Sequence, residues 1–277
     1  MTFDGTANFS AYDQVEALSN YRTPGELEGY RRERIEKYAP YLTMLSALGI
    51  ATGPVSVVDI GSGSSAFLYG LERRRLLREG VGIELSATRH AFAERWRVDE
   101  GFERVSNICA NFTDVPLAAA AYDLFSVLDD TYLYLRPESE DYPARLFETA
   151  RRSLRPGGFL VFDFRNDVPL VGAMPPEGRS FTVDLPETNP FASAFYRQAL
   201  SRDWRTLLNE SRYLARDGTE TSKVEITEVC DVTALTATLR DAGFHPVTAY
   251  GDLSLAAFDE RTSPRAVVVA RSPLEGR

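Results

Sequence analysis

The stretch 55-VSVVDIGSGSSAF-67 combines a short apolar run with two glycines, and it raises the question of which ligand its turn can hold. A glycine-rich turn after a strand exposes backbone N–H groups at the start of the next helix, and small residues let a ligand approach the backbone. Gly61, Gly63 and Ala66 fit the spacing of the nicotinamide-dinucleotide fingerprint. Glu84 follows where a ribose-binding carboxylate belongs. Taken alone, this match leaves the ligand open.

Three features favour the methyl donor S-adenosylmethionine (SAM) over a dinucleotide. Asp59 directly precedes the glycines, where a carboxylate repels a pyrophosphate but suits a sulfonium and an ammonium. The loop 111-NFTD-114 offers a side-chain amide to an adenine edge. After the helix expected at 234–243, two strands joined by a short loop form a closing hairpin in place of another βα unit.

Strands and helices alternate along the segment that surrounds these residues, which predicts a parallel, doubly wound α/β sheet. We expect strands at 55–60, 80–85, 105–109, 122–128 and 159–164, and helices at 65–77, 87–96 and 143–154. The helix at 143–154 is expected to stop at 155-RPGG-158. Two further strands are expected near 247–250 and 266–270.

The rest of the chain suggests three parts. Residues 1–50 read as a helical segment, with an amphipathic helix or helix pair broken before Pro40. Residues 51–165 and 231–277 form the sheet domain. Residues 166–230 begin with several prolines and continue into extended runs at 204–215 and 223–229, which indicates an antiparallel insertion.

The ordered motifs VVDIGSG, GIELS, NFTDVPL, YDLFSVLDDTYLYL, LRPGGFLVFDFRN and AGFHPVTAYGDL resemble those of class I SAM-dependent methyltransferases over about residues 55–271. The resemblance implies a Rossmann-like seven-stranded sheet with its last strand antiparallel, and SAM as the cofactor. It also implies that Asp59, Gly61 and Gly63 lie along the amino-acid end of SAM and that Glu84 grips the ribose hydroxyls. The expected adenine-side and remaining cofactor contacts are Asn111, Phe112 and Leu128. Ser65 stands where the family has its third glycine.

The substrate side is expected over the carboxyl ends of the strands. The chain resembles glycine-type and sugar-amine N-methyltransferases, which carry a tyrosine-bearing N-terminal segment and an antiparallel lid. We therefore expect residues 1–50 and 166–230 to act as lids. The candidate catalytic residues are Tyr12, Asp130 and Tyr134, and the candidate substrate-binding residues are Tyr21, Tyr132, Arg165 and Asn166. The tyrosines can equally serve packing, Asp130 can cap a short helix, and Arg165 can pair with Asp163 or Asp167.

Composition limits the function classes. The net charge of −9 opposes sequence-independent nucleic-acid binding, which needs basic surface. No apolar run approaches the roughly 20 residues of a membrane helix, and the first residues do not form a signal peptide. Two cysteines, Cys109 and Cys230, and two histidines, His90 and His245, have no zinc spacing. We expect a metal-free cytoplasmic protein with a small-molecule substrate, in which a homo-oligomer is compatible with the sequence.

The predicted function is methyl transfer from SAM to a small molecule, with an amine of a sugar or antibiotic as the first candidate acceptor. The lid resemblance and the acidic residues near the expected pocket favour nitrogen, and O-methylation is the alternative. Other classes that the sequence leaves open are an NAD-dependent oxidoreductase, a methyltransferase acting on macromolecules, and a cofactor-binding protein without turnover.

Overall fold

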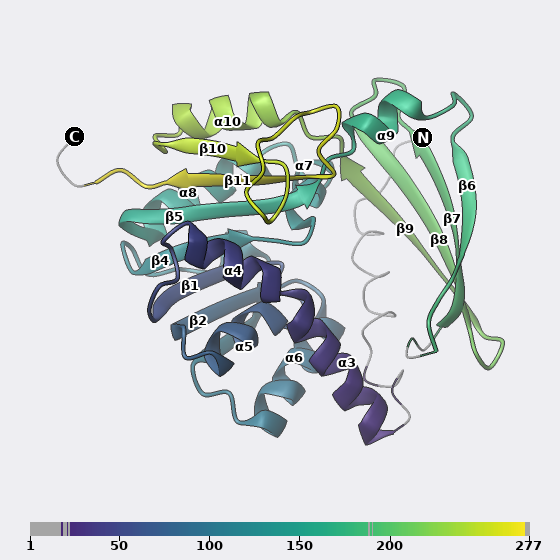
Figure 1. Ribbon diagram of the computed structural model, residues 1–277, viewed down its shortest axis with the longest axis horizontal. Helices are drawn as coiled ribbons and strands as arrows, with labels where there is room; N and C mark the ends of the chain where they lie inside the picture. Colours follow the sequence, from purple (N-terminus) through teal and green to yellow (C-terminus); the bar gives the residue numbers. More distant parts are fainter. Residues whose placement is uncertain (1–17, 19–20, 22, 188, 190, 275–277) are drawn as a thin grey trace.

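The computed structural model describes residues 18, 21, 23–187, 189 and 191–274, and these form two sheets (Figure 1). The larger sheet has seven strands. In the order in which they lie across the sheet, they are β10 (Val247–Tyr250), β11 (Arg265–Arg271), β5 (Leu154–Arg165), β4 (Tyr122–Val127), β1 (Val55–Ile60), β2 (Leu77–Glu84) and β3 (Val105–Cys109).

The strand order reverses between β1 and β4. Strand β1 pairs in parallel with β2 on one side and with β4 on the other, and β11 runs antiparallel to both β5 and β10. The predicted α/β sheet with its last strand antiparallel is therefore confirmed. In sheets of this kind, ligands bind outside the carboxyl ends of the strands at the point of reversal.

Both faces of the larger sheet are covered by helices, so its central strands are buried on both sides (Figure 1). Alternation along β1 directs Val57 to one core cluster and Val58 to the other. The helices on the Val57 side are α3 (Pro24–Lys37), α4 (Ala39–Ala47), α5 (Ala66–Arg73) and α6 (Ala87–Glu100). Those on the Val58 side are α7 (Leu135–Glu138), α8 (Tyr142–Ser153) and α10 (Val232–Asp241).

The described part of the N-terminal segment is built into this core. Helix α3 begins with a capping box between Thr23 and Glu26, and α4 follows with Pro40 in its first turn, as the sequence predicts. Ile35 and Leu45 are buried against the sheet domain. These helices therefore pack as part of the sheet domain, while Tyr12, the tyrosine expected in the lid, lies outside the described residues.

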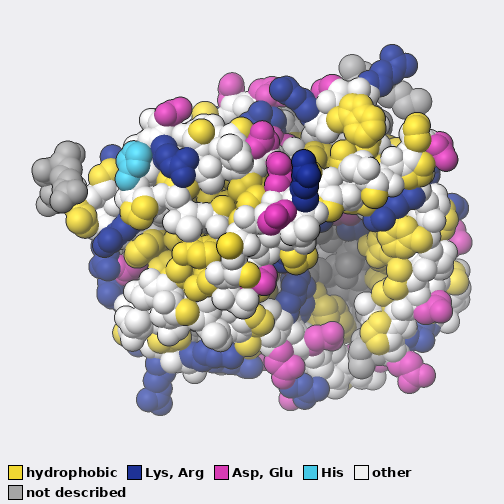
Figure 2. All heavy atoms as spheres, turned by 45° about the horizontal axis from the view of Figure 1, so that its top comes forward, with side chains coloured by type: hydrophobic (Ala, Val, Ile, Leu, Met, Phe, Trp, Pro, Cys, Tyr) yellow, Lys and Arg dark blue, Asp and Glu magenta, His cyan; other side chains and the backbone are white. Residues whose placement is uncertain are grey.

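The insertion forms the second sheet, as its extended runs predict. It begins with α9 (Val168–Ala173) and continues as the antiparallel strands β6 (Arg179–Asp184), β7 (Phe191–Leu200), β8 (Thr206–Ala215) and β9 (Glu220–Glu228). This sheet stands opposite the carboxyl ends of the larger sheet (Figure 1). Figure 2 shows a hollow between the two bodies.

Two strands begin several residues before their predicted starts. Strand β2 begins at Leu77, because α5 ends at Arg73 and Arg75 turns the chain with a positive φ of 58°. Strand β5 begins at Leu154 and includes 155-RPGG-158, which was expected to lie outside the strand. The pairing with β4 jumps from Tyr122–Leu154 to Leu124–Phe159, so this stretch bulges out of the register, and the small Gly158 lies close to the backbone of β4.

Candidate active site

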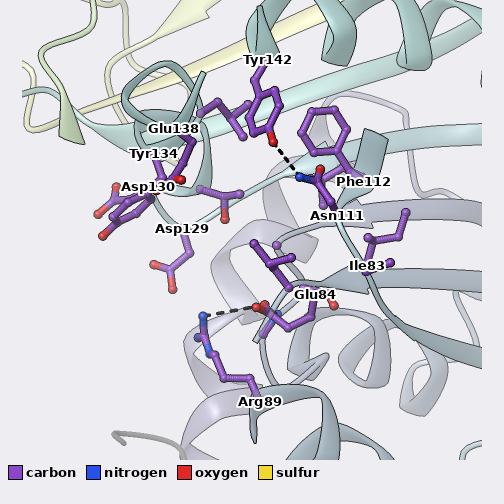
Figure 3. A pocket seen from close by; sticks show the side chains of 18 of the residues that line it. Ile83, Glu84, Arg89, Asn111, Phe112, Asp129, Asp130, Tyr134, Glu138 and Tyr142 are labelled. Carbon is purple, nitrogen blue, oxygen red and sulfur yellow. Dashed lines mark hydrogen bonds and ion pairs between the residues drawn. The ribbon is translucent and has the colours of Figure 1, made fainter. Parts of the chain in front are cut away.

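A cavity of about 320 Å³ opens at the point where the strand order reverses. This volume lies within the range of small-molecule sites. Its described walls are Tyr38, Ile60, Gly61, Ser62, Gly63, Ile83, Glu84, Leu85, Arg89, Ala110, Asn111, Phe112, Asp129, Asp130, Thr131, Tyr134, Leu135, Glu138, Tyr142, Arg165 and Glu225. Figure 3 shows the side chains that point into it. The larger sheet and the insertion both contribute to this one cavity.

The glycine turn forms the floor of the cavity and requires glycine at two positions. Gly61 and Gly63 have positive φ values of 66° and 56°. A Cβ on Gly61 would collide with the side chain of Thr131, and one on Gly63 would lie 2.8 Å from the Arg89 guanidinium. Ser65 keeps the left-handed conformation of the glycine that it replaces, with a φ of 58°. The turn therefore leaves its backbone open to a ligand.

Glu84 lies at the carboxyl end of β2 and is almost completely buried beside this turn. Its Oε2 accepts a hydrogen bond from the Gly63 N–H and its Oε1 accepts one from the Ser86 N–H, each at 2.8 Å. A carboxylate has about four lone-pair sites, so each oxygen can accept a further bond. Two ribose hydroxyls match this remaining capacity, and the residues present fit the ribose of SAM.

Asp59 lies behind the turn and does not line the cavity. Its Oδ1 accepts a hydrogen bond from the Ser126 hydroxyl at 2.7 Å. Burial raises the pKa of Asp59 to about 7, although the Ser126 hydrogen bond lowers it. The expected contact with the amino-acid end of SAM is therefore at most indirect, through the charge that Asp59 carries beneath the glycines.

The adenine side of the predicted site is an apolar wall with one amide. Phe112 and Ile83 line the cavity, and the short helix η2 (Phe112–Asp114) begins there. The Asn111 Oδ1 accepts from the Thr113 N–H at 3.1 Å and from the Thr113 hydroxyl at 3.0 Å, so this oxygen caps η2. The Asn111 Nδ2 donates to the Tyr142 hydroxyl at 2.8 Å (Figure 3). Asn111 thus offers its N–H groups more readily than its oxygen.

Two carboxylates after β4 line the cavity, and both have cationic partners. Lys37 donates to Asp129 at 2.5 Å. Although burial alone would raise the pKa of Asp129, the Lys37 ammonium holds it below its usual range. Asp130 accepts from the Arg165 backbone N–H and Nη1 at 2.7 and 3.0 Å, and from the Arg265 Nη2 at 3.1 Å. These two guanidinium groups offset the charge that was expected to attract a cationic acceptor.

Arg165 joins the two sheets at the edge of the cavity. Besides Asp130, it pairs with Asp167 through Nε at 3.0 Å, which is one of the ion pairs that the sequence left open. Its Nη2 donates to the Thr227 hydroxyl of β9 at 2.8 Å. Arg165 therefore lines the cavity while it fixes the insertion against the end of β5.

Tyr134 and Glu225 meet at the wall that the insertion supplies. Tyr134 ends the short helix η3 (Thr131–Tyr134), and its hydroxyl donates to the Glu225 Oε1 at 2.7 Å. The Glu225 Oε2 is paired with the Lys223 ammonium at 2.9 Å. Tyr12 and Tyr134 are the two tyrosines expected to orient a substrate. Tyr12 lies outside the described residues, and Tyr134 lines the cavity.

Besides Asp59, four further residues expected at the site lie away from this cavity. Tyr132 is buried among Phe147, Phe162 and Phe164. The Asn166 Nδ2 donates to the Glu260 and Ser263 carbonyls, at 2.7 and 2.9 Å. The remaining two are Leu128, which is buried in the core, and Tyr21, whose ring packs at a tilt against Tyr30 and Phe92. In this structure, each of these four has a packing or loop-fixing role.

The structure adds cavity residues that the sequence reasoning missed. They include Tyr38, Arg89, Thr131, Glu138, Tyr142 and Glu225. Arg89 had a local signal, since it follows Glu84 by little more than one helical turn, and its Nη1 lies 3.9 Å from the Glu84 carboxylate. Glu225 had none, because its place depends on how the insertion docks.

Residues 58–162 match the family model described as a methyltransferase domain. The chain carries a methyltransferase domain. The predicted enzyme class is confirmed, and SAM, the cofactor predicted from the sequence, is the methyl donor of this class of enzyme. The domain match spans β1 to β5 and so includes the glycine turn, Glu84 and Asn111.

Solved structures share the fold of the whole chain. The CcbJ methyltransferase from Streptomyces caelestis is 19% identical, with a TM-score of 0.74 over 98% of this chain and 100% of that one. CalS10, a SAM-bound amino pentose methyltransferase from Micromonospora echinaspora involved in calicheamicin biosynthesis, is 18% identical, with a TM-score of 0.61 over 91% and 97%. The sugar N-methyltransferase KedS8 from Streptoalloteichus sp ATCC 53650 is 19% identical, with a TM-score of 0.56 over 90% and 87%.

Among curated proteins, none matches this sequence significantly. Within the part of the chain that the structure describes, no group of three or more His, Cys, Asp or Glu side chains can hold a metal ion. In the same residues, no helix has both the length and the apolar character needed to cross a bilayer.

Proposed function

We propose that this protein transfers the methyl group of SAM to an amine nitrogen of a small molecule, with an amino sugar or an antibiotic amine as the first candidate acceptor. The observation that carries the proposal is the continuity of the cavity. One wall holds the glycine turn and Glu84, and the facing wall holds Tyr134 and Glu225. A donor held by the first wall and an acceptor held by the second would therefore share one cavity.

The reaction is an in-line displacement in which SAM supplies an electrophilic methyl group, so alignment and exclusion of water are the main demands on the protein. Glu84 would hold the ribose, and Ile83 and Phe112 would enclose the adenine. The docked insertion would keep water from the acceptor side. An uncharged amine needs no strong base, and a protonated amine must first lose a proton to solvent or to a side chain.

We assign roles in this reaction to the predicted site residues. Tyr134 orients the acceptor, and Tyr12 remains a candidate for the same task. Asp130 helps to form the substrate wall, and Arg165 holds the insertion in place. Tyr21, Tyr132, Asn166 and Leu128 support the site through packing or loop contacts. Asp59 acts through its charge beneath the glycine turn.

Two of the similar solved structures support nitrogen as the acceptor atom. CalS10 is described as an amino pentose methyltransferase and KedS8 as a sugar N-methyltransferase. O-methylation is the second candidate, because the Tyr134 hydroxyl can also accept a hydrogen bond from an alcohol. By the same analogy, we propose a role in antibiotic biosynthesis. We also propose that the protein is cytoplasmic and that it acts on a small molecule and not on nucleic acid. A homo-oligomer is compatible with this proposal.

The deciding experiment compares matched acceptors. Purified protein is incubated with SAM and with pairs of sugars that carry an amino or a hydroxyl group at the same position, free and nucleotide-linked. Release of S-adenosylhomocysteine and the mass of the product are measured. Methylation of the amino sugars supports the proposal. Transfer to hydroxyl sugars alone would favour O-methylation, and SAM binding without any transfer would contradict the proposed acceptor class.

A further inference from the structure

We infer that Glu225 is a positioning residue for the methyl acceptor, which it aligns through the hydroxyl of Tyr134. This inference rests on the proposed function and assigns a task to the insertion beyond that of a cover. Tyr134, which follows β4 of the larger sheet, would contact the acceptor. Glu225, in the insertion, would hold the Tyr134 hydroxyl in place.

The hydrogen bond between these residues crosses from one sheet to the other. Tyr134 belongs to η3, which follows β4, whereas Glu225 belongs to β9 of the insertion. The hydroxyl and the Glu225 Oε1 are 2.7 Å apart, and both residues line the cavity. The side chain of Glu225 is 12% exposed, so water screens this contact little.

The direction of this hydrogen bond follows from the charge of Glu225. The Lys223 ammonium lies 2.9 Å from the Glu225 Oε2 and favours the ionised carboxylate. An ionised carboxylate only accepts, so the Tyr134 hydroxyl must donate its single proton to Glu225. The phenol oxygen then acts toward other groups as an acceptor, which is the role that an N–H of an amine needs.

Three other acids of the cavity have fixed partners within the protein, and the remaining hydrogen-bonding capacity of one of them, Glu84, suits the ribose of SAM. Both oxygens of Glu84 accept backbone N–H groups of the glycine turn and of Ser86. Asp129 pairs with Lys37, and Asp130 pairs with two arginines. Glu225 differs because its hydrogen bond ends on a hydroxyl that lines the cavity, so its influence can be passed to a substrate.

The chemistry needs this alignment more than it needs a base. The nitrogen lone pair of the amine forms the new N–C bond while the S–C bond breaks and its electron pair stays on sulfur. An N–H bond that points to the Tyr134 oxygen turns the lone pair toward the methyl group. The methylated nitrogen carries the positive charge and later loses a proton to water, so Tyr134 stays neutral throughout.

The position of Glu225 also couples this alignment to docking of the insertion. Thr227, two residues along β9, accepts the hydrogen bond from the Arg165 Nη2 at 2.8 Å. Strand β9 is therefore fixed to the larger sheet by two side-chain contacts close together, one at Glu225 and one at Thr227. The Tyr134 hydroxyl is directed only when β9 is in place.

A double-mutant cycle tests the inference, with SAM and a panel of free and nucleotide-linked amino sugars as the acceptors. Tyr134→Phe and Glu225→Ala should each lower kcat about tenfold, the effect of one hydrogen bond lost at the reacting group. The double variant should lose no more than either single variant, because both changes remove the same interaction. Glu225→Gln keeps an acceptor oxygen and should recover part of kcat. The dissociation constant for SAM should stay unchanged in all four proteins.

Glu210→Ala is the matched control, since Glu210 lies in β8 of the same sheet, pairs with Arg197 and is 41% exposed. It should keep the wild-type kcat. Losses that multiply in the double variant, or wild-type kcat in Glu225→Ala, would overturn the role of Glu225 while leaving the methyltransferase proposal intact. SAM binding without transfer to any amine would overturn the proposed acceptor class and this inference together.

Discussion

Arg265 forms a two-pronged ion pair with Asp163, from Nε to Oδ1 at 2.7 Å and from Nη2 to Oδ2 at 2.8 Å. Asp163 is completely buried in β5, and its Oδ2 also accepts the Tyr41 hydroxyl at 2.5 Å. The same Nη2 of Arg265 reaches Asp130 at the cavity. The last strand of the sheet therefore supplies one guanidinium that offsets the charge of a core carboxylate, Asp163, and of a cavity carboxylate, Asp130.

Replacing Arg265 should be costly. Arg265→Met removes the partner of a buried charge, and breaking such a pair typically lowers the free energy of unfolding by about 3–5 kcal/mol. Arg197→Met is the control, because Arg197 and Glu210 form an exposed pair that should contribute only about 0–1 kcal/mol. Urea denaturation followed by circular dichroism measures both. A loss for Arg265→Met no larger than that of the control would show that Asp163 is satisfied without it.

Local patterns were enough to predict the sheet and to bring Gly61, Gly63 and Glu84 together at one cavity wall. The apolar run before Gly61, the glycine spacing and the position of Glu84 all lie within one βαβ unit, so local sequence determines how they meet. Arg265 and Glu225 could not be predicted in this way. Each meets its partner across a large sequence separation, and each contact depends on how the strands of two sheets are finally placed.

The two tyrosines after β4 show why a local pattern can mislead. Both were expected to face the substrate. The segment Thr131–Tyr134 is a 3₁₀-helix, in which side chains three residues apart eclipse each other. Thr131 and Tyr134 therefore share the cavity side, while Tyr132 points into the aromatic core. The choice between the two faces requires the helix type, which the sequence alone did not indicate.

Glu84 should dominate binding of the cofactor. Glu84→Ala removes the carboxylate from the ribose site, and hydrogen bonds to charged groups are each worth about 1.5–3 kcal/mol, so the dissociation constant for SAM should rise at least tenfold. Calorimetry measures it. Glu103→Ala, in an exposed turn before β3, should bind SAM like the wild type. An unchanged dissociation constant in a folded Glu84→Ala protein would remove Glu84 from the site.

Asn111 should act first as the cap of η2. Asn111→Asp keeps an oxygen that can accept from the Thr113 N–H, so it should retain most of the SAM affinity, whereas Asn111→Leu leaves the cap unmade and should weaken binding. Tyr142→Phe tests the other contact of Asn111 by itself, since it removes only the hydroxyl to which the Asn111 Nδ2 donates and leaves the cap of η2 intact. Dissociation constants from calorimetry compare the three variants. A loss in Asn111→Asp as large as that in Asn111→Leu would show that the amide N–H groups are what the ligand needs.

Asp59 should make stability depend on pH in a predictable direction. Burial raises its folded pKa to about 7, above the ordinary value of 3.8, so the folded state holds a proton that the unfolded chain releases between these values. The stability that this group contributes is complete below pH 3.8 and is lost as the pH rises toward 7, with a slope of at most about 1.4 kcal/mol per pH unit. Asp59→Asn keeps the size and shape of the side chain but cannot titrate.

Between pH 5 and 8, the free energy of unfolding should therefore fall more for the wild type than for Asp59→Asn. The other titrating groups are the same in both proteins, so their contributions cancel in this difference. Urea denaturation at several pH values measures the difference. Parallel pH profiles for the two proteins would mean that Asp59 is ionised in the folded state, and its negative charge would then lie permanently beneath the glycine turn.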